Sequence, residues 1–282
     1  MTEISPLLRP LPQDLRRRAR LARIGEIPVL LAHPDWERPA PTVLWMHGRT
    51  ATKELDPGRY LRWLRAGIAT CAIDLPGHGE RLVSEYHTPV RTLDMLEQAV
   101  GEVDSVVEYL ASPEHRGVFD LDRLGIGGMS AGGMVTLRRL CEGHEFRCAA
   151  VEGTTGNLAG LYVPRRGGPG EEAPWPVRHD ESRVALLDPM QNLVGGGVGF
   201  RPLPLLALHS EADRMIPVGV QRRFVEVLRG HYVARGADPS LIEFTTWPET
   251  GAPDEHVGFG RVSNDAKNLQ TDFLSRSLRA GG

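Results

Sequence analysis

Residues 124–133 read LGIGGMSAGG, and Ser130 is the single polar side chain in this run. Gly128 and Gly132 flank it in the pattern Gly-x-Ser-x-Gly. Apolar residues typical of a strand precede the serine, and apolar residues of a helix follow it over 134–140. A serine on such a tight strand-to-helix turn holds its hydroxyl above the end of a sheet, where a substrate can reach it. The run therefore predicts a nucleophilic serine in an α/β protein.

The surroundings of this serine favour chemistry more than the pattern does. The chain contains 32 glycines, so Gly-x-Ser-x-Gly can arise by chance. It carries weight here because a strand precedes it and a helix follows it. The first turn of that helix presents unpaired N–H groups and the positive end of the helix dipole. An oxyanion formed beside Ser130 would be stabilised at this helix end.

Strand-like and helical patterns alternate along the chain. The strand-like runs are 27–34, 42–48, 69–77, 123–130, 148–153, 204–213 and 242–248. Helical patterns cover 56–66, 93–110, 131–142, 217–229 and 261–279. Several strand runs are apolar throughout, as expected for parallel strands buried on both faces. The alternation predicts an α/β fold with a mostly parallel, doubly wound sheet, and about eight strands are expected.

One segment interrupts this alternation. Residues 153–202 contain ten glycines and six prolines, a composition that does not sustain long regular elements. A structureless loop of that length is rare in a compact domain unless it is functional or disordered. We interpret 153–202 as an irregular lid inserted into a single domain of residues 1–282. A variable surface excursion is the alternative interpretation.

Composition and charge argue against several classes of protein. The net charge of -3 argues against a nucleic-acid partner, which would call for a strongly basic domain. No segment approaches the ~18 uninterrupted apolar residues of a membrane span, so no membrane partner is expected. The arginines at positions 16, 17, 18, 20 and 23 are interpreted as the solvated face of an N-terminal helix. Nothing in the first thirty residues resembles an export signal, and cytoplasmic residence is expected.

Metal and disulfide chemistry are not expected either. The three cysteines are scattered, and none has the CxxC spacing of a metal or redox site. Cys148 follows His144 by four residues, but no further ligand cluster and no HExxH pattern accompany them. The sequence therefore predicts reduced cysteines and a protein without a metal or other cofactor.

A serine nucleophile needs a base to accept its proton and an acid to orient that base. On this type of fold the acid and then the histidine follow the serine along the chain. Asp213 ends the strand-like run LHSEAD, and His256 lies in the loop ETGAPDEHVGFG after the last strand. Glu152, at the end of CAAVEG, is a second candidate for the acid. Asp213 is favoured over Glu152.

Several motifs together resemble the α/β-hydrolase superfamily. They are GGMSAGG at the serine, MHG after an early strand, DLPGHGER, and LHSEADRMIP, and they follow one another in the family order over roughly residues 25–279. Within the superfamily the chain is most similar to serine esterases and peptidase-related members near the dienelactone hydrolase and prolyl oligopeptidase groups. A dienelactone hydrolase would carry cysteine at the position of Ser130. The resemblance implies an α/β-hydrolase fold.

The resemblance also implies where the oxyanion hole lies. The family forms it from the N–H after the nucleophile, here Ala131, and from an N–H just past the HG turn. Arg49 is favoured for the second donor, and Thr50 is the alternative. By the same resemblance His47, His78 and Asp74 belong to family turns and are expected to be structural hydrogen-bonding groups, and His209 is expected to be a satisfied histidine at a strand end.

The predicted function is that of a serine hydrolase acting on small carboxylic esters through an acyl-enzyme. The pocket is expected to be shaped by the segment 153–202, whose large aromatic residues include Tyr162 and Trp175. The expected partner is the small ester substrate, and the oligomeric state stays open. Amide or peptide hydrolysis is one alternative, since the peptidase branch shares these motifs. A catalytically silent hydrolase fold that serves as a binding module is the other.

Overall fold

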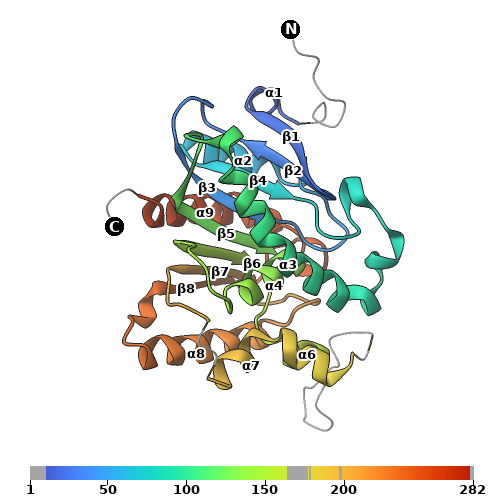
Figure 1. The fold of residues 1–282 in the computed structure, drawn as a ribbon. Coiled ribbons are helices and arrows are strands. Elements are labelled where there is room, and N and C mark those ends of the chain that lie inside the picture. The colour runs from blue at the N-terminus through green and yellow to red at the C-terminus, as the bar shows by residue number, and fades with distance from the viewer. Residues whose placement is uncertain (1–10, 164–176, 178, 197–198, 280–282) are drawn as a thin grey trace.

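The computed structural model describes residues 11–163, 177, 179–196 and 199–279. Within them eight strands form one sheet in the order β1-β2-β4-β3-β5-β6-β7-β8 (Figure 1). The strands are β1 (Ala19–Ile24), β2 (Ile27–Ala32), β3 (Ala40–Met46), β4 (Ala69–Ile73), β5 (Phe119–Met129), β6 (Cys148–Glu152), β7 (Leu205–Ser210) and β8 (Ile242–Trp247). The helices are α1 (Gln13–Arg16), α2 (Pro57–Arg65), α3 (Thr92–Leu110), α4 (Ala131–Arg139), α5 (Leu158–Tyr162), α6 (Glu181–Leu187), α7 (Pro189–Val194), α8 (Val218–Ala234) and α9 (Ser263–Ser277).

The sheet is mostly parallel, as the alternation of patterns predicts. β1 pairs antiparallel with β2 and β2 with β4, whereas every pair from β4 through β3 to β8 is parallel. Every residue of β2, β4, β6 and β7 is buried, while the edge strands β1 and β8 are partly exposed. β2, β4, β6 and β7 are mostly apolar because helices cover both faces of the sheet.

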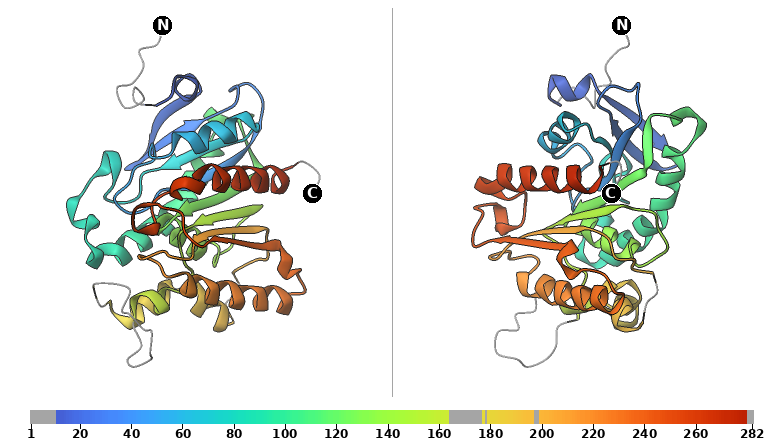
Figure 2. Two further views of the ribbon diagram at one scale, coloured as in Figure 1. Left: turned by 180° about the vertical axis from the view of Figure 1, so that it is seen from behind. Right: turned by 90° about the vertical axis from the view of Figure 1, so that its left-hand side faces the viewer.

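Helices cover both faces of the sheet, and the sheet separates the hydrophobic core into two parts. α3 and α4 lie in front of the sheet in Figure 1, and α9 lies in front once the molecule is turned by 180° in Figure 2. The larger core contains side chains of α3, α4 and α8, such as Leu96, Val135 and Phe224. The smaller core contains side chains of α2 and α9, such as Trp63 and Phe273.

The strand order reverses at β3, and this reversal creates the site. β4 follows β3 along the chain and lies on one side of it, while β5 lies on the other side. The connections that leave β3 and β5 therefore diverge above the carboxyl ends of these strands. Open α/β sheets bind their ligands in the crevice that such a reversal opens. Ser130 follows β5, and the loop that begins at His47 follows β3.

Most of the N-terminal arginines lie outside a helix, contrary to the prediction. Within the described residues, α1, a helix of four residues that ends at Arg16, is the only helix before β1, and Arg20 and Arg23 lie on this strand. Both are exposed, and the Arg20 guanidinium lies 3.7 Å from the ring centre of Trp36. The prediction was wrong because solvated arginines on an edge strand look the same in sequence as those on a helix. Pairing of Ala19–Ile24 with β2 decided the structure.

The described part of the segment 153–202 contains short helices. Its described part includes α5, α6 and α7, and several of its side chains, such as Leu161 and Leu187, belong to the larger core. Asp188 caps α7, and its carboxylate also accepts the N–H of Ala159 in α5 at 2.7 Å. Arg183 of α6 forms an ion pair with Glu97 of α3 at 2.7 Å. The described part of the segment is thus attached to the main domain.

Candidate active site

Ser130 occupies the turn between β5 and α4 with φ 51° and ψ -116°. A residue with a side chain adopts such a conformation at a cost of about 1 to 3 kcal/mol. The flanking glycines make the turn possible. A Cβ atom on Gly132 would lie 2.3 Å from the carbonyl oxygen of Met46, and one on Gly128 would lie 2.4 Å from the backbone of Gly132. The strand-to-helix turn predicted for Gly-x-Ser-x-Gly is present.

Backbone hydrogen bonds hold this turn in place. The N–H of Ser130 donates to the carbonyl oxygen of Glu152 at 2.8 Å. The carbonyl oxygen of Ser130 accepts from Met134 N at 3.0 Å and from the Thr154 hydroxyl at 2.7 Å. The strained conformation persists because neighbouring strands and the first turn of α4 determine it on both sides.

His256 brings its imidazole to the serine. Its Nε2 atom lies 2.9 Å from the Ser130 hydroxyl oxygen, although 126 residues separate the two along the chain. The histidine follows a single 3-10 turn, η7 (Pro253–Glu255), in which Asp254 and Glu255 have φ values of 50° and 52°. The His256 residue is 8% exposed, so one ring edge meets the hydroxyl while most of the ring is shielded from water.

Asp213 contacts the other nitrogen of this ring. Its Oδ2 atom lies 2.7 Å from His256 Nδ1. Its Oδ1 atom accepts the N–H groups of Met215 and Ile216, both at 2.8 Å. The carboxylate is therefore fixed by its own loop and needs no movement to meet the imidazole. The structure brings together the three side chains that the sequence analysis selected, from loops after β5, β7 and β8.

Glu152, the second candidate for the acid, faces another partner. Arg59 binds it through two hydrogen bonds, Nη1 to Oε1 at 2.6 Å and Nη2 to Oε2 at 2.7 Å. Gln270 Nε2 donates to Oε1 at 2.9 Å. Both Arg59 and Glu152 are buried, and the guanidinium also lies 4.4 Å from the ring centre of Trp45. Glu152 reaches Ser130 only through its backbone carbonyl.

The loop after β3 passes beside the serine. A Cβ on Gly48 would lie 3.3 Å from Cβ of Ser130. Arg49 and Thr50 both line the cavity at the serine, and Thr50 has a φ of 65°. Ala131, on the other side, is the first residue of α4, so its N–H belongs to the helix end that lacks intrahelical acceptors. The two predicted oxyanion donors thus come from segments that flank Ser130.

A cavity of about 200 Å³ opens beside these residues. Apolar side chains dominate its lining: Leu55, Met129, Met134, Tyr162, Met215, Ile216 and Val257. Tyr162 is fully buried, and its hydroxyl lies 3.3 Å from the sulfur of Met134. Tyr162 therefore lies where the sequence analysis placed a pocket residue, whereas Trp175 lies outside the described residues. Among the described lining residues Arg49 is the one with a permanently charged side chain.

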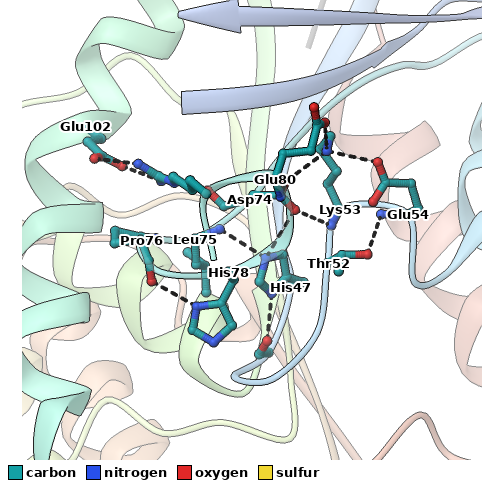
Figure 3. Close-up of polar contacts among 12 residues, drawn as sticks. His47, Thr52, Lys53, Glu54, Asp74, Leu75, Pro76, His78, Glu80 and Glu102 are labelled. Atoms are coloured by element: carbon teal, nitrogen blue, oxygen red, sulfur yellow. Dashed lines mark hydrogen bonds and ion pairs between the residues drawn. The ribbon is translucent and has the colours of Figure 1, made fainter. Parts of the chain in front are cut away.

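Three histidines of the site region are held as hydrogen-bonding groups. Burial lowers the pKa of His47 to about 4, and its Nδ1 contacts Gly48 O at 2.6 Å while its Nε2 accepts the N–H of Leu75 at 3.0 Å. His78 Nδ1 contacts Pro76 O at 2.8 Å (Figure 3). His209 Nε2 contacts Ile216 O at 2.8 Å, and burial lowers its pKa.

Two charged residues that the sequence analysis did not single out organise the loops of the site. Glu255 precedes His256 and accepts from Thr250 N at 2.6 Å, from the Thr250 hydroxyl at 2.7 Å and from the Ser210 hydroxyl at 2.9 Å. These hydrogen bonds, led by the one from the Thr250 N–H, lower the pKa of Glu255 to about 2. Lys53 lies in the loop after β3, which runs from residue 47 to residue 56, and it is buried. Its signal in sequence is rarity, because the chain has only one other lysine, Lys267.

The described residues also bear on metal binding and on membrane insertion. No group of three or more histidine, cysteine, aspartate or glutamate side chains there has the arrangement of a metal site. Cys148 is buried, and burial raises the pKa of its thiol to about 12. In the same part of the chain no helix is long and apolar enough to cross a membrane.

Comparison with protein families matches residues 59–280 to the prolyl oligopeptidase family. This chain belongs to that family. The match includes Ser130, Asp213 and His256 and covers most of the sheet. Family membership confirms the predicted resemblance, the α/β-hydrolase fold and the assignment to the hydrolases.

Individual relatives are distant. "Putative esterase YitV" of Bacillus subtilis (strain 168) is 23% identical over 212 residues, which cover 73% of this chain and 80% of the relative. "Esterase YjfP" of Escherichia coli (strain K12) is 28% identical over 130 residues, which cover 45% of this chain and about half, 51%, of the relative. The acylaminoacyl peptidase of Pyrococcus horikoshii superposes with a TM-score of 0.69 at 17% identity, covering 94% of this chain but 42% of the peptidase. The last likeness concerns the fold alone.

Proposed function

We propose that this protein is a serine hydrolase that cleaves small carboxylic esters through an acyl-enzyme intermediate. The observation that carries the proposal is the contact series from Ser130 Oγ to His256 Nε2 at 2.9 Å and from His256 Nδ1 to Asp213 Oδ2 at 2.7 Å. A serine, a histidine and a buried carboxylate in this order form a catalytic triad on several unrelated folds. The adjoining cavity gives a substrate access to the hydroxyl.

The reaction follows from the contacts of each group. His256 Nε2 accepts the proton of Ser130 as Oγ bonds to the ester carbonyl carbon, and Asp213 holds the imidazolium that forms. The carbonyl oxygen becomes an oxyanion, which receives the backbone N–H groups of Ala131 and Arg49. The ester C–O bond then breaks, and the proton on Nε2 passes to the leaving alcohol. Water, deprotonated by the same nitrogen, attacks the acyl-enzyme and releases the carboxylic acid.

The cavity supports a small apolar acyl group. Its volume of about 200 Å³ is below the ~300 to 1,000 Å³ typical of pockets for drug-sized ligands. Methionine side chains at positions 129, 134 and 215 supply much of the apolar lining. Since methionine is flexible and adapts to different shapes, we expect tolerance of several short acyl chains. We further propose that the segment 153–202 acts as a lid that shapes this pocket, with Tyr162 as its contribution.

Amide or peptide hydrolysis is the second candidate, and family membership favours it specifically. Two distant relatives carry esterase names, which supports the ester proposal. A short panel of p-nitrophenyl esters of graded acyl length, assayed beside an aminoacyl p-nitroanilide, separates the candidates. We expect kcat/KM for the best ester to exceed that for the anilide by orders of magnitude. A preference for the anilide would replace the esterase proposal by an amidase one.

The proposal of catalysis itself is tested by covalent labelling. Ser130 Oγ should displace fluoride from an alkyl fluorophosphonate, so that intact mass rises by one phosphonyl group and hydrogen fluoride is lost. Ser130→Ala should remain unlabelled and should lose ester turnover by many orders of magnitude while it stays folded. A wild-type protein that neither labels nor turns over any ester would be a binding module.

A further inference from the structure

Lys53 carries a buried ammonium in the loop after β3. It is 1% exposed, and it is one of only two lysines in a chain with 33 lysines and arginines. Three carboxylates surround its Nζ atom: Glu80 at 2.5 Å, Asp74 at 2.8 Å and Glu54 at 2.9 Å (Figure 3). A buried charge is tolerated only when an opposite charge compensates it. Here three carboxylates compensate the ammonium.

The backbone of Lys53 is held as firmly as its side chain. Its N–H donates to Asp74 Oδ1 at 2.9 Å, so one carboxylate receives both the backbone and the ammonium. Its carbonyl oxygen accepts the hydroxyl of Tyr60 at 2.7 Å. Asp74 Oδ2 also accepts the N–H of Glu80 at 3.0 Å. Lys53 is thus fixed against the turn that follows β4, from Asp74 to Glu80.

An ammonium suits this position better than a guanidinium does. Its donors point in three directions from one atom, whereas the donors of arginine lie in a plane. The three carboxylates approach Nζ from Glu54 in the same loop and from two positions of the neighbouring turn. Burial opposes the charge, but the hydrogen bonds to Asp74, Glu80 and Glu54 outweigh it and raise the pKa of Lys53. In a chain that otherwise uses arginine almost throughout, this geometry accounts for a lysine.

The same turn also holds the start of the loop. His47 begins the loop, and its Nε2 accepts the N–H of Leu75, next to Asp74. The loop is therefore anchored at His47 and at Lys53 to one turn (Figure 3). Between these anchors it passes Ser130 at Gly48 and places Arg49 and Thr50 in the cavity lining. A displacement of either anchor would move the N–H groups beside the serine.

We propose that Lys53 is a positioning residue, whose buried contacts with three carboxylates fix the loop that supplies the second oxyanion donor. The inference rests on the proposed serine-hydrolase function. Oxyanion donors act through geometry, since they must lie ~2.7 to 3.1 Å from the position of the developing negative charge. Loss of the ammonium leaves Asp74, Glu80 and Glu54 facing one another, and their repulsion moves the loop. The transition state loses stabilisation, while the apolar cavity that binds the ground state keeps its lining.

The test compares Lys53→Met and Lys53→Arg with a control ion pair far from the serine. Arg139→Met is the control, because Arg139 is the last residue of α4 and its buried guanidinium contacts Asp104 of α3 at 2.5 Å. We expect Lys53→Met to lower kcat for a p-nitrophenyl ester by about 10²-fold, which matches the loss of one oxyanion donor, with KM within about threefold. Arg139→Met should keep kcat within about threefold at a temperature where it is folded, whatever stability it loses.

Two further measurements separate positioning from general destabilisation. The Ki of an alkyl boronic acid, which forms a tetrahedral adduct with the serine, should rise for Lys53→Met in proportion to the fall in kcat/KM. Lys53→Arg keeps the charge but not the donor geometry, and should lose about tenfold in kcat. If either folded variant retains kcat and Ki within about threefold of the wild type, the role of Lys53 is refuted. A wild type that is neither active nor labelled at Ser130 would instead contradict the proposed function.

Discussion

Glu152 ends β6 and Asp213 lies in the loop after β7, the neighbouring parallel strand, and both acids are buried. Asp213 directs one oxygen to His256 and the other to two backbone N–H groups of its own loop. Glu152 has both oxygens bound to Arg59, and Gln270 donates to one of them. Position at the carboxyl end of a strand therefore does not define a catalytic acid. The partner that the tertiary structure supplies to each carboxylate defines its role.

The carboxylates of Glu152 and Asp213 also differ in the role of their negative charge. Glu152 compensates a guanidinium from which almost all water is excluded, so its value to the protein is in stability. Asp213 contacts the imidazole of His256, and in the proposed reaction it stabilises this ring when the ring accepts the proton of Ser130. The contrast predicts that substitutions at the two positions separate activity from stability.

The largest expected effect is that of Asp213→Asn on turnover. An amide in place of the carboxylate favours the wrong tautomer of His256 and cannot stabilise its protonated form, so kcat should fall by roughly 10⁴. The free energy of unfolding should change little, because the amide oxygen can still accept hydrogen bonds from Met215 N and Ile216 N. Ester assays and urea unfolding on the same preparation check both statements. A variant with more than about a tenth of the wild-type kcat would remove Asp213 from the triad.

Glu152→Gln should show the opposite profile. The change leaves Arg59 buried with only Asp56, 3.2 Å away, as its remaining carboxylate. Breaking a buried ion pair from one side costs about 3 kcal/mol or more in unfolding free energy. Activity should fall by no more than about tenfold, since the side chain does not contact His256. A loss of turnover comparable to that of Asp213→Asn, without a loss of stability, would reverse the assignment of the acid.

A second histidine–aspartate pair, His47 and Asp74, extends the comparison to the pH dependence of stability. His47 Nε2 lies 3.8 Å from Asp74 Oδ1, but this carboxylate is bound to Lys53, and burial lowers the pKa of His47 to about 4. The unfolded chain, in which the histidine pKa is ~6.5, binds the proton more readily than the folded protein. Stability from this group is therefore complete above pH ~6.5 and is lost as pH falls towards 4, by about 3 kcal/mol in all.

The His47→Gln variant isolates this contribution. Glutamine can donate and accept hydrogen bonds at the same position but does not titrate. Urea unfolding at pH 7 and pH 4.5 should show a smaller acid-induced loss for the variant than for the wild type, by about 2 kcal/mol. Equal losses in the two proteins would show that His47 is not held neutral by burial.

The smallest effect is expected when both members of the buried pair are replaced. An Arg59→Met and Glu152→Leu double variant removes two charges at once, and apolar replacements of buried ion pairs are often neutral or stabilising. We expect its unfolding free energy to lie within about 1 kcal/mol of the wild type, in contrast to Glu152→Gln. Chemical unfolding of the wild type, Glu152→Gln and the double variant checks this expectation. A double variant as unstable as Glu152→Gln would assign the cost to the apolar replacements or to Gln270, which loses its acceptor.

The sequence by itself determined the fold class, and it predicted the three side chains of the proposed triad. Apolar runs for β2, β4, β6 and β7 are buried on both faces, so their composition alone marks them as inner strands. Ser130 could be predicted from the sequence because its turn requires glycines at fixed positions before and after the serine. His256 and Asp213 could be predicted because this fold places the acid and then the histidine after the serine along the chain. The edge strand β1 was missed, since its arginines are solvated and its strand character comes from pairing with β2.

Only the tertiary structure decided which buried charges meet. Arg59 lies 93 residues before Glu152, and Gln270 lies 118 residues after it, so no local pattern links them. Lys53 likewise contacts Asp74, 21 residues later in the chain, and Glu80, 27 residues later. Contacts of this kind depend on the distance between the ends of two strands and on the direction in which a loop leaves its strand. A sequence records the residues that can carry charge, but the distances that set their roles arise when the sheet brings their strands together.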